Sequence, residues 1–190
     1  MKEEQVIEIF KETGVLQEGH FKLSSGLHSD QYLQCAQVLQ HPIHAQKLAE
    51  GLAAKFTDLE IDLVVGPAMG GVTLAYAVGL AMEQKTIFTE REEGEMTLRR
   101  GFQINPDDKI LVVDDVLTTG KSVREVIEVI EQNGAELAAV GTLVDRSNGQ
   151  VDFGVPTESM LAVDVKTYEP DECPMCEQGL KIDKPGSREI

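Results

Sequence analysis

The chain has 190 residues, of which 42% are hydrophobic and 26% charged, and its formal net charge at pH 7 is −16. A chain of this length buries a core without disulfides or metals, so we predict one domain spanning residues 1–190. The acidic charge argues against nucleic acid and against anionic membranes as partners. A polar N-terminus, the lack of an apolar run of ~20 residues and an odd count of three cysteines favour a cytoplasmic protein.

Along the chain, segments with helical spacing of apolar residues alternate with short apolar runs. The predicted helices are residues 3–12, 42–56, 70–82 and 120–132. The predicted strands are residues 61–65, 86–88, 109–113 and 137–144. Strands separated by helices of this length predict an α/β fold with an open, mainly parallel sheet flanked by helices. Ligands of such sheets bind beyond the carboxyl ends of the strands.

Residues 110–122 run from a predicted strand into a predicted helix. Their sequence, Ile-Leu-Val-Val-Asp-Asp-Val-Leu-Thr-Thr-Gly-Lys-Ser, places two carboxylates before a turn rich in hydroxyl groups. Such a turn at a helix N-terminus can bind a phosphate group. A purely structural capped turn would not need the paired carboxylates, and a nucleoside-triphosphate loop would need glycine where Asp115 stands. The combination indicates a ligand that has both sugar hydroxyls and a phosphate, such as a phosphoribosyl group.

This segment resembles the signature with which type I phosphoribosyltransferases bind phosphoribosyl pyrophosphate (PRPP). The resemblance implies that Asp114 and Asp115 face the ribose hydroxyls and that residues 118–122 hold the 5-phosphate. It also implies Mg²⁺, bound mainly through PRPP and bridging its pyrophosphate. Residues 65–72 are similar to the pyrophosphate loop of the family. The residues implied to bind PRPP are Ala68, Met69, Gly70, Arg91, Asp114, Asp115, Val116, Leu117, Thr118, Thr119, Gly120, Lys121 and Ser122.

Two other segments are similar to orotate phosphoribosyltransferases. Residues 21–32 look like the N-terminal segment that covers the base in that family, although on their own they read equally well as a Gly/Ser turn before an edge strand. Arg146 follows the fourth predicted strand, where the family uses an arginine against the orotate carboxylate, and a guanidinium suits this task because it forms two parallel hydrogen bonds. The residues implied to bind orotate are Ser25, Gly26, Tyr32, Thr118 and Arg146.

The resemblance implies transfer of ribose 5-phosphate from PRPP to orotate in pyrimidine biosynthesis. Transfer to another base, and a non-catalytic PRPP-sensing regulator, remain as alternatives. Within the single domain we expect an N-terminal hood over the base site (residues 1–40), an α/β core (41–165) and an irregular C-terminal tail (166–190).

Residues 90–101 depart from the mobile loop of the family. Arg91 is retained, but the lysines and the histidine that the family carries are missing, and three glutamates are added. Three further positions, where some family members place lysine or tyrosine, are Ser24, Gly70 and Met69. We predict that Arg91, Arg99 and Arg100 are catalytic and stabilise the departing pyrophosphate, with solvated loop charges as the alternative for the last two. The resemblance also implies a homodimer in which loop 91–101 reaches the site of the partner.

The tail contains the pair Cys173-Pro-Met-Cys176. This pair could form half of a zinc site or a redox pair, but a closed zinc site needs four ligands and no histidine is near it in sequence. We therefore predict an ordinary turn with two thiols, and no metal-binding residues. The histidines at positions 20, 28, 41 and 44 are predicted to lie at the surface or in turns.

Overall fold

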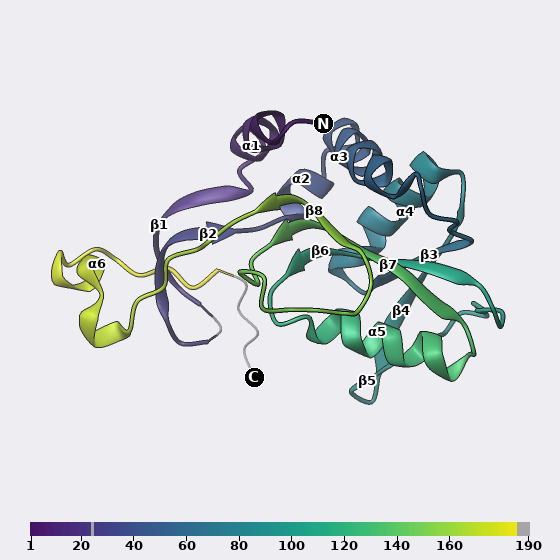
Figure 1. The fold of residues 1–190 in the computed structure, drawn as a ribbon. Helices are drawn as coiled ribbons and strands as arrows, with labels where there is room; N and C mark the ends of the chain where they lie inside the picture. The colour runs from purple at the N-terminus through teal and green to yellow at the C-terminus, as the bar shows by residue number, and fades with distance from the viewer. Residues whose placement is uncertain (24, 186–190) are drawn as a thin grey trace.

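The computed structural model describes residues 1–23 and 25–185, and its centre is a six-stranded sheet (Figure 1). The strand order is β5-β4-β3-β6-β7-β8, and all neighbouring strands are parallel except β5, which is antiparallel to β4. The strands are β3 (Leu63–Pro67), β4 (Lys85–Glu92), β5 (Glu95–Thr97), β6 (Lys109–Leu117), β7 (Glu136–Asp145) and β8 (Thr157–Ala162). The predicted open, mainly parallel sheet is confirmed.

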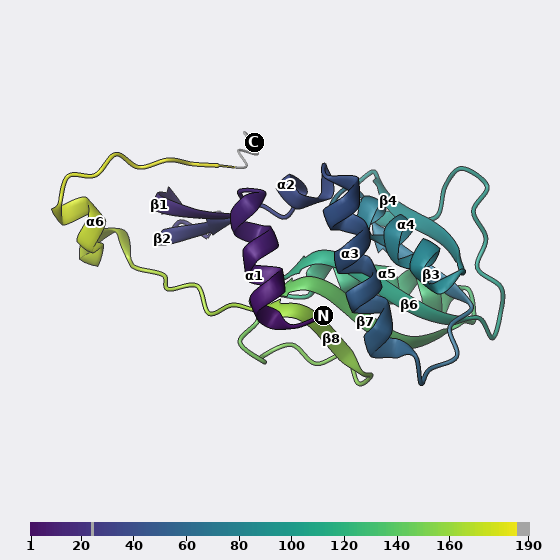
Figure 2. The ribbon, with the colours of Figure 1, turned by 90° about the horizontal axis from the view of Figure 1, so that it is seen from above.

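Helices cover both faces of this sheet. Helices α1, α3 and α4 lie on one face and α5 on the other (Figures 1 and 2). The helices are α1 (Glu3–Glu12), α2 (Ala36–Leu39), α3 (Pro42–Ala53), α4 (Gly70–Met82), α5 (Lys121–Gln132) and α6 (Pro174–Glu177), with 3₁₀ turns η1 (Ala54–Phe56) and η2 (Pro170–Glu172). Among these described helices, none is long and apolar enough to cross a bilayer.

Alternation along the central strand β6 divides the core in two. Leu111 and Val113 join the cluster beneath α1, α3 and α4, whereas Ile110 and Val112 join the cluster beneath α5. All four side chains are fully buried, as expected for a parallel strand that is covered on both faces. The last residues of β6 directly follow this fully buried run, which fixes their position at the end of the strand.

A second sheet, the β1–β2 hairpin, extends away from the core (Figure 1). It pairs β1 (Leu16–Lys22) with β2 (His28–Leu33) in antiparallel register. The tail runs along it: the backbones of Tyr168 and His28 exchange two hydrogen bonds of 2.9 Å, and the N–H of Lys22 donates to the carbonyl of Asp183 at 2.8 Å. The tail segment is thus attached to the hairpin at both ends.

Most predicted elements are confirmed, with limited changes at their ends. The predicted helix over 42–56 ends at Ala53 and continues as the 3₁₀ turn η1, and the predicted strand over 86–88 is longer, because β4 extends to Glu92. Strands β1, β5 and β8 were not predicted, whereas β2 corresponds to the edge strand considered after the Gly/Ser turn. The unpredicted strands carry charged or polar residues and lie at sheet edges, where alternation with core residues is weak.

Candidate active site

Successive strands are added to the sheet in opposite directions from β3 and from β6. From β3 the chain passes through α4 to β4 on one side, and from β6 it passes through α5 to β7 on the other. The carboxyl ends of β3 and β6 therefore lie next to each other, while the connections that leave them diverge. In open α/β sheets this point forms a crevice in which ligands bind.

Two carboxyl groups occupy the end of β6 at this crevice. Asp114 is buried, Asp115 is partly buried, and the backbone N–H of Asp115 donates to Oδ1 of Asp114 at 2.9 Å. Burial, reinforced by the neighbouring Asp115 carboxylate, raises the pKa of Asp114 to about 8, and burial also raises the pKa of Asp115. Such a pair is stabilised by a ligand that offers hydroxyl donors or positive charge.

The turn after β6, residues 118–122, is predicted to bind the phosphate and is called the phosphate turn below. Thr118 and Thr119 are exposed, and Gly120 begins α5 with φ of 74°, a conformation that favours glycine. A side chain on Gly120 would also collide with Val151 and Phe153, which would lie 2.8 and 3.0 Å from its Cβ. The amide groups at the start of α5 have no intrahelical partners, so with the threonine hydroxyls they can bind an anion.

The loop after β3 approaches the carboxylate pair from the other side. A Cβ atom placed on Gly70, the first residue of α4, would lie 2.6 Å from Oδ1 of Asp115. Any larger residue at this position would require the Asp115 carboxyl group to move. The structure thus brings Gly70 together with Asp115, and Ala68 and Met69 precede it in the same loop.

The hairpin and the end of β7 enclose a cleft of about 780 Å³ beside the phosphate turn. Residues predicted for substrate binding that line it are Ser25, Tyr32, Val116, Thr118, Thr119 and Arg146. Gly26, with φ of 91°, shapes the hairpin turn next to Ser25. Ser24 lies outside the described residues. The hairpin residues and the end of the core sheet therefore border one shared cavity.

Arg146 is held in place by the backbone and leaves its side chain available. Its N–H donates to the carbonyl of Leu117 at 2.8 Å, which ties the end of β7 to the end of β6. Among the residues that the structure describes, the guanidinium forms no ion pair, and its buried Nε has no hydrogen-bond partner. Burial lowers the pKa of Arg146, although it stays far above neutral as for any arginine. A half-buried guanidinium without an ion-pair partner among the described residues is well suited to an anionic ligand.

Tyr32 and Cys35 adjoin this arginine. The Tyr32 hydroxyl donates to Oε1 of Gln34 at 2.8 Å, and its ring packs against Phe21 at a centroid distance of 5.6 Å. Burial raises the pKa of Tyr32, while the positive charge of Arg146 opposes this shift. Tyr32 is therefore a neutral aromatic wall of the cleft at physiological pH.

The three arginines predicted to be catalytic lie in or beside the β4–β5 hairpin and are bound to glutamates. Arg91 forms an ion pair with Glu125 on α5 and donates to the carbonyl of Gly94 at 3.1 Å. Arg99 lies 3.3 Å from a carboxylate oxygen of Glu92, and Nε of Arg100 lies 3.1 Å from Glu90. In this conformation the arginines point to acidic partners, so a catalytic role requires them to exchange these partners for substrate.

Several cleft residues were missed in the sequence. The cleft is also lined by Leu23, Leu33, Ser147, Asn148, Gln150, Val151, Thr167 and Pro185. Ser147 could have been found from its place directly after Arg146, and its buried hydroxyl has no partner among the described residues. Thr167 and Pro185 come from the tail and carry no recognisable signal in the sequence.

The prediction for two of the four histidines is wrong. His20 and His28 lie on β1 and β2, with only 4% and 6% of their surfaces exposed, and both approach Cys173 and Cys176. No histidine is near the cysteine pair in sequence, but the fold places two of them beside it. The fold brings together residues that are more than 140 positions apart.

Comparisons of the sequence and of the structure with known proteins all match phosphoribosyltransferases. A model of the phosphoribosyl transferase domain matches residues 34–153. An orotate phosphoribosyltransferase of Desulforamulus reducens is 54% identical over 190 residues, and one of Caldanaerobacter subterraneus is 50% identical, with all of each chain covered in both cases. The crystal structure of orotate phosphoribosyltransferase from Aeropyrum pernix superposes with a TM-score of 0.68 at 27% identity, covering 83% of this chain and 93% of that one.

Proposed function

This chain belongs to the phosphoribosyl transferase family, and within it to the orotate phosphoribosyltransferases, and on that basis we propose that it transfers ribose 5-phosphate from PRPP to orotate. The products are orotidine 5′-monophosphate and pyrophosphate, as in pyrimidine biosynthesis. The observation that carries the choice of base is the unpaired guanidinium of Arg146, which lies in the cleft beside the phosphate turn.

The crevice provides a place for each part of PRPP. The turn at Thr118 and Thr119 and the start of α5 bind the 5-phosphate. Asp114 and Asp115 accept hydrogen bonds from the ribose hydroxyls, which relieves the cost of two adjacent buried carboxylates. The loop before Gly70 lies on the other side of Asp115 and receives the pyrophosphate.

Orotate then lies in the cleft beneath the hairpin. Its carboxylate forms paired hydrogen bonds with Arg146, its ring lies near Tyr32, and the turn at Ser25 closes over it. This placement directs the ring nitrogen N1 toward the ribose held by the carboxylate pair. Covering the cleft also keeps water away from a donor that would otherwise hydrolyse.

The reaction exchanges one bond at the ribose for another. The bond from C1 to the pyrophosphate oxygen breaks with its electron pair leaving on pyrophosphate, and a bond from orotate N1 to C1 forms, while the N1 proton goes to solvent. The transition state has oxocarbenium character, so no protein nucleophile is needed. Catalysis comes from holding donor and acceptor in line and from stabilising charge on the leaving group.

We also propose that Mg²⁺ accompanies PRPP and is bound mainly through it. The donor set fits, since Asp114 and Asp115 offer carboxylate oxygens, the ligand type that Mg²⁺ prefers, at the place where PRPP would lie. When bound, the ion would neutralise charge on the pyrophosphate. In the chain itself the same task falls to Arg91, with Arg99 and Arg100 as further candidates.

We further propose a cytoplasmic homodimer in which loop 91–101 serves the partner's site. Four large apolar side chains on or directly before α3 and α4 are well exposed and support association through these helices: Ile43, Met69, Tyr76 and Leu80. Exposed apolar groups are common in protein interfaces. Three free thiols agree with a reducing compartment.

The test of the proposed reaction is a direct assay. The protein is incubated with PRPP, Mg²⁺ and, in separate reactions, orotate, uracil, adenine, guanine or hypoxanthine, and nucleotide formation is followed by absorbance and chromatography. We expect product with orotate alone. Efficient use of uracil or a purine would overturn the assignment of the base, and PRPP binding without any product would favour the PRPP-sensing regulator.

A further inference from the structure

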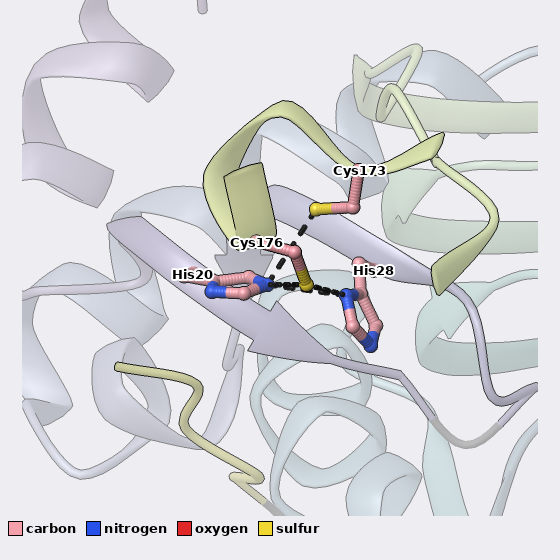
Figure 3. Close-up of side chains that lie close together, drawn as sticks. All are labelled: His20, His28, Cys173 and Cys176. Atoms are coloured by element: carbon pink, nitrogen blue, oxygen red, sulfur yellow. Dashed lines mark hydrogen bonds between the residues drawn. The ribbon is translucent and has the colours of Figure 1, made fainter. Parts of the chain in front are cut away.

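We propose that His20, His28, Cys173 and Cys176 bind a structural Zn²⁺ ion that fastens the C-terminal tail to the β1–β2 hairpin. The four side chains come from three separate parts of the chain. His20 belongs to β1, His28 begins β2, and the two cysteines flank the start of α6 in the tail, as Figure 3 shows. One potential ligand atom from each residue lies within 4.8 Å of all the others.

The distances between the ligand atoms match a tetrahedral site. Nε2 of His20 lies 3.1 Å from Nδ1 of His28, 3.6 Å from Sγ of Cys173 and 3.7 Å from Sγ of Cys176, and this last sulfur lies 3.3 Å from Nδ1 of His28. With Zn–S near 2.3 Å and Zn–N near 2.0–2.1 Å, tetrahedral geometry separates ligand atoms by roughly 3.3–3.8 Å. The three nitrogen–sulfur distances fall in this range, and the distance between the two nitrogens is slightly shorter, so the side chains surround a volume close to the size of such a site.

The orientation of His20 supports the same assignment. Its other ring nitrogen, Nδ1, lies 2.9 Å from the carbonyl oxygen of Leu180. A carbonyl can only accept, so Nδ1 carries the proton and Nε2 presents its lone pair to the cluster. Zinc-binding histidines are commonly oriented in this way, by a carbonyl or carboxylate on the nitrogen that does not face the metal.

Apart from backbone hydrogen bonds near its two ends, the tail has few apolar contacts that would hold it against the hairpin. Residues 169–185 contain Met175 as their only well-buried large apolar side chain, while Leu180 and Ile182 are 51% and 39% exposed. Cys173 is nevertheless fully buried, together with two histidines. A polar segment of this length does not bury enough apolar surface to offset its ordering entropy, and a metal cross-link supplies the missing free energy.

Two other interpretations explain less. A redox pair would use Cys173 and Cys176 and would leave the two buried, converging histidines without a role. A cluster joined only by hydrogen bonds would gather several acceptors around thiols, which are weak donors. Two nitrogen and two sulfur ligands in tetrahedral arrangement favour Zn²⁺ among the common metal ions.

The site is separate from the substrate cleft but linked to it mechanically. None of the four ligands lines the cleft, whereas Thr167 and Pro185, which flank the metal-bound tail segment, do line it. The hairpin that carries His20 and His28 also carries Ser25 and Tyr32 on the cleft wall. By holding the tail against the hairpin, zinc would position the hairpin residues Ser25 and Tyr32 over the base site. This role rests on the function proposed above.

Metal analysis tests the site without using enzyme activity. The full chain is purified without chelators or metal-affinity steps from zinc-supplemented culture, and its metal content is measured by mass spectrometry. We expect about one zinc ion per chain in the parent and in His41→Asn, whose histidine lies outside the cluster. The variants Cys176→Ser and Cys173→Ser/Cys176→Ser should lose it. Absence of zinc from the parent after incubation with zinc, or retention by the double variant, would overturn the proposal.

Cobalt substitution provides a test that needs no variant. Replacing zinc by Co²⁺ in the parent should give the strong visible absorption of tetrahedral cobalt together with thiolate-to-cobalt charge-transfer bands. Weak bands of a six-coordinate ion, or the lack of charge transfer, would contradict the S₂N₂ site. This result does not depend on whether a cysteine variant folds.

The positioning role has its own measurement. Removing zinc should increase hydrogen exchange in residues 168–183 and raise KM for orotate severalfold, with little change in KM for PRPP. Zinc loss with unchanged KM for orotate would refute the positioning role. A parent that binds zinc but makes no nucleotide from orotate would instead refute the proposed function and leave the metal site standing.

Discussion

The backbone N–H of Asp115 donates a hydrogen bond of 2.9 Å to Oδ1 of Asp114, near the end of the central strand β6. This contact holds the first carboxyl group beside the second, where burial and mutual repulsion raise the pKa of Asp114 to about 8. Without a ligand the arrangement is unfavourable at neutral pH. The pair is therefore explained by what it binds and not by the stability of the fold.

Replacing either carboxylate should weaken the binding of PRPP. In Asp114→Asn and Asp115→Asn we expect the Kd for PRPP with Mg²⁺ to rise about tenfold or more, since a hydrogen bond to a charged group contributes about 1.5–3 kcal/mol. Calorimetry measures this change. The exposed Asp58→Asn serves as the matched control. Unchanged PRPP affinity in both variants would show that these carboxylates do not bind the ribose.

The same carboxyl group predicts how stability depends on pH. The pKa of Asp114 in the folded protein, about 8, lies above its ordinary value of 3.8, so the folded state binds this proton more tightly than the unfolded state. Its contribution is complete below about pH 4 and is lost as the pH rises toward 8. The free energy of unfolding should therefore fall over this range.

Urea unfolding at pH 5 to 8.5, without ligand, measures this effect, and Asp114→Asn isolates it from other acidic groups. The variant should lose less stability than the parent as the pH rises. Parallel curves for parent and variant would show that Asp114 titrates normally.

The sequence predicts the carboxylate pair and the phosphate turn because both lie in one continuous segment. Four apolar residues of β6, two aspartates, a hydroxyl-rich turn and the start of α5 follow each other directly, so local rules of strand, turn and helix formation suffice. The role predicted for Arg146 rests instead on the resemblance to the family, which uses an arginine at the corresponding place after the fourth predicted strand.

Other parts of the site depend on contacts between distant segments. His20 and Cys173 are 153 positions apart, and only the pairing of the tail with the hairpin brings them together. The ion pair between Arg91 and Glu125 likewise joins an edge strand to a helix on one face of the sheet. No spacing along the chain encodes such contacts.

Arg146 is expected to select orotate. Arg146→Ala should raise the Kd or KM for orotate by about 30-fold or more, because removing one partner of a charge pair in a partly dry site costs about 2 kcal/mol or more. Binding of PRPP should change little. Steady-state kinetics with each substrate varied in turn provides the measurement.

The conservative variant Arg146→Lys refines this test. It retains the positive charge but cannot form two parallel hydrogen bonds, so we expect an intermediate loss for orotate. If Arg146→Ala weakens the binding of PRPP and of orotate equally, or if the parent uses uracil as well as orotate, the guanidinium does not recognise the orotate carboxylate.

Arg91 is expected to act on the leaving pyrophosphate after it releases Glu125. Arg91→Ala should lower kcat by about 100-fold or more while the affinity for orotidine 5′-monophosphate stays nearly constant, since the interaction belongs to the transition state. Glu125→Gln weakens the ion pair seen here and should leave kcat unchanged or higher. Rapid-quench kinetics separates the chemical step from product release.

The dimeric form of this prediction can be tested by mixing two inactive variants. In a mixed dimer of Arg91→Ala and Thr118→Ala, one site would contain both an intact Arg91 from one chain and an intact phosphate turn from the other, provided that loop 91–101 reaches across the interface. Activity should then recover to a fraction of the parent value after subunit exchange, which is verified by mass spectrometry of differently tagged chains. Verified exchange without recovery would mean that each loop serves its own subunit. A kcat of Arg91→Ala equal to that of the parent would remove Arg91 from catalysis, and the ion pair with Glu125 would then account for the residue by itself.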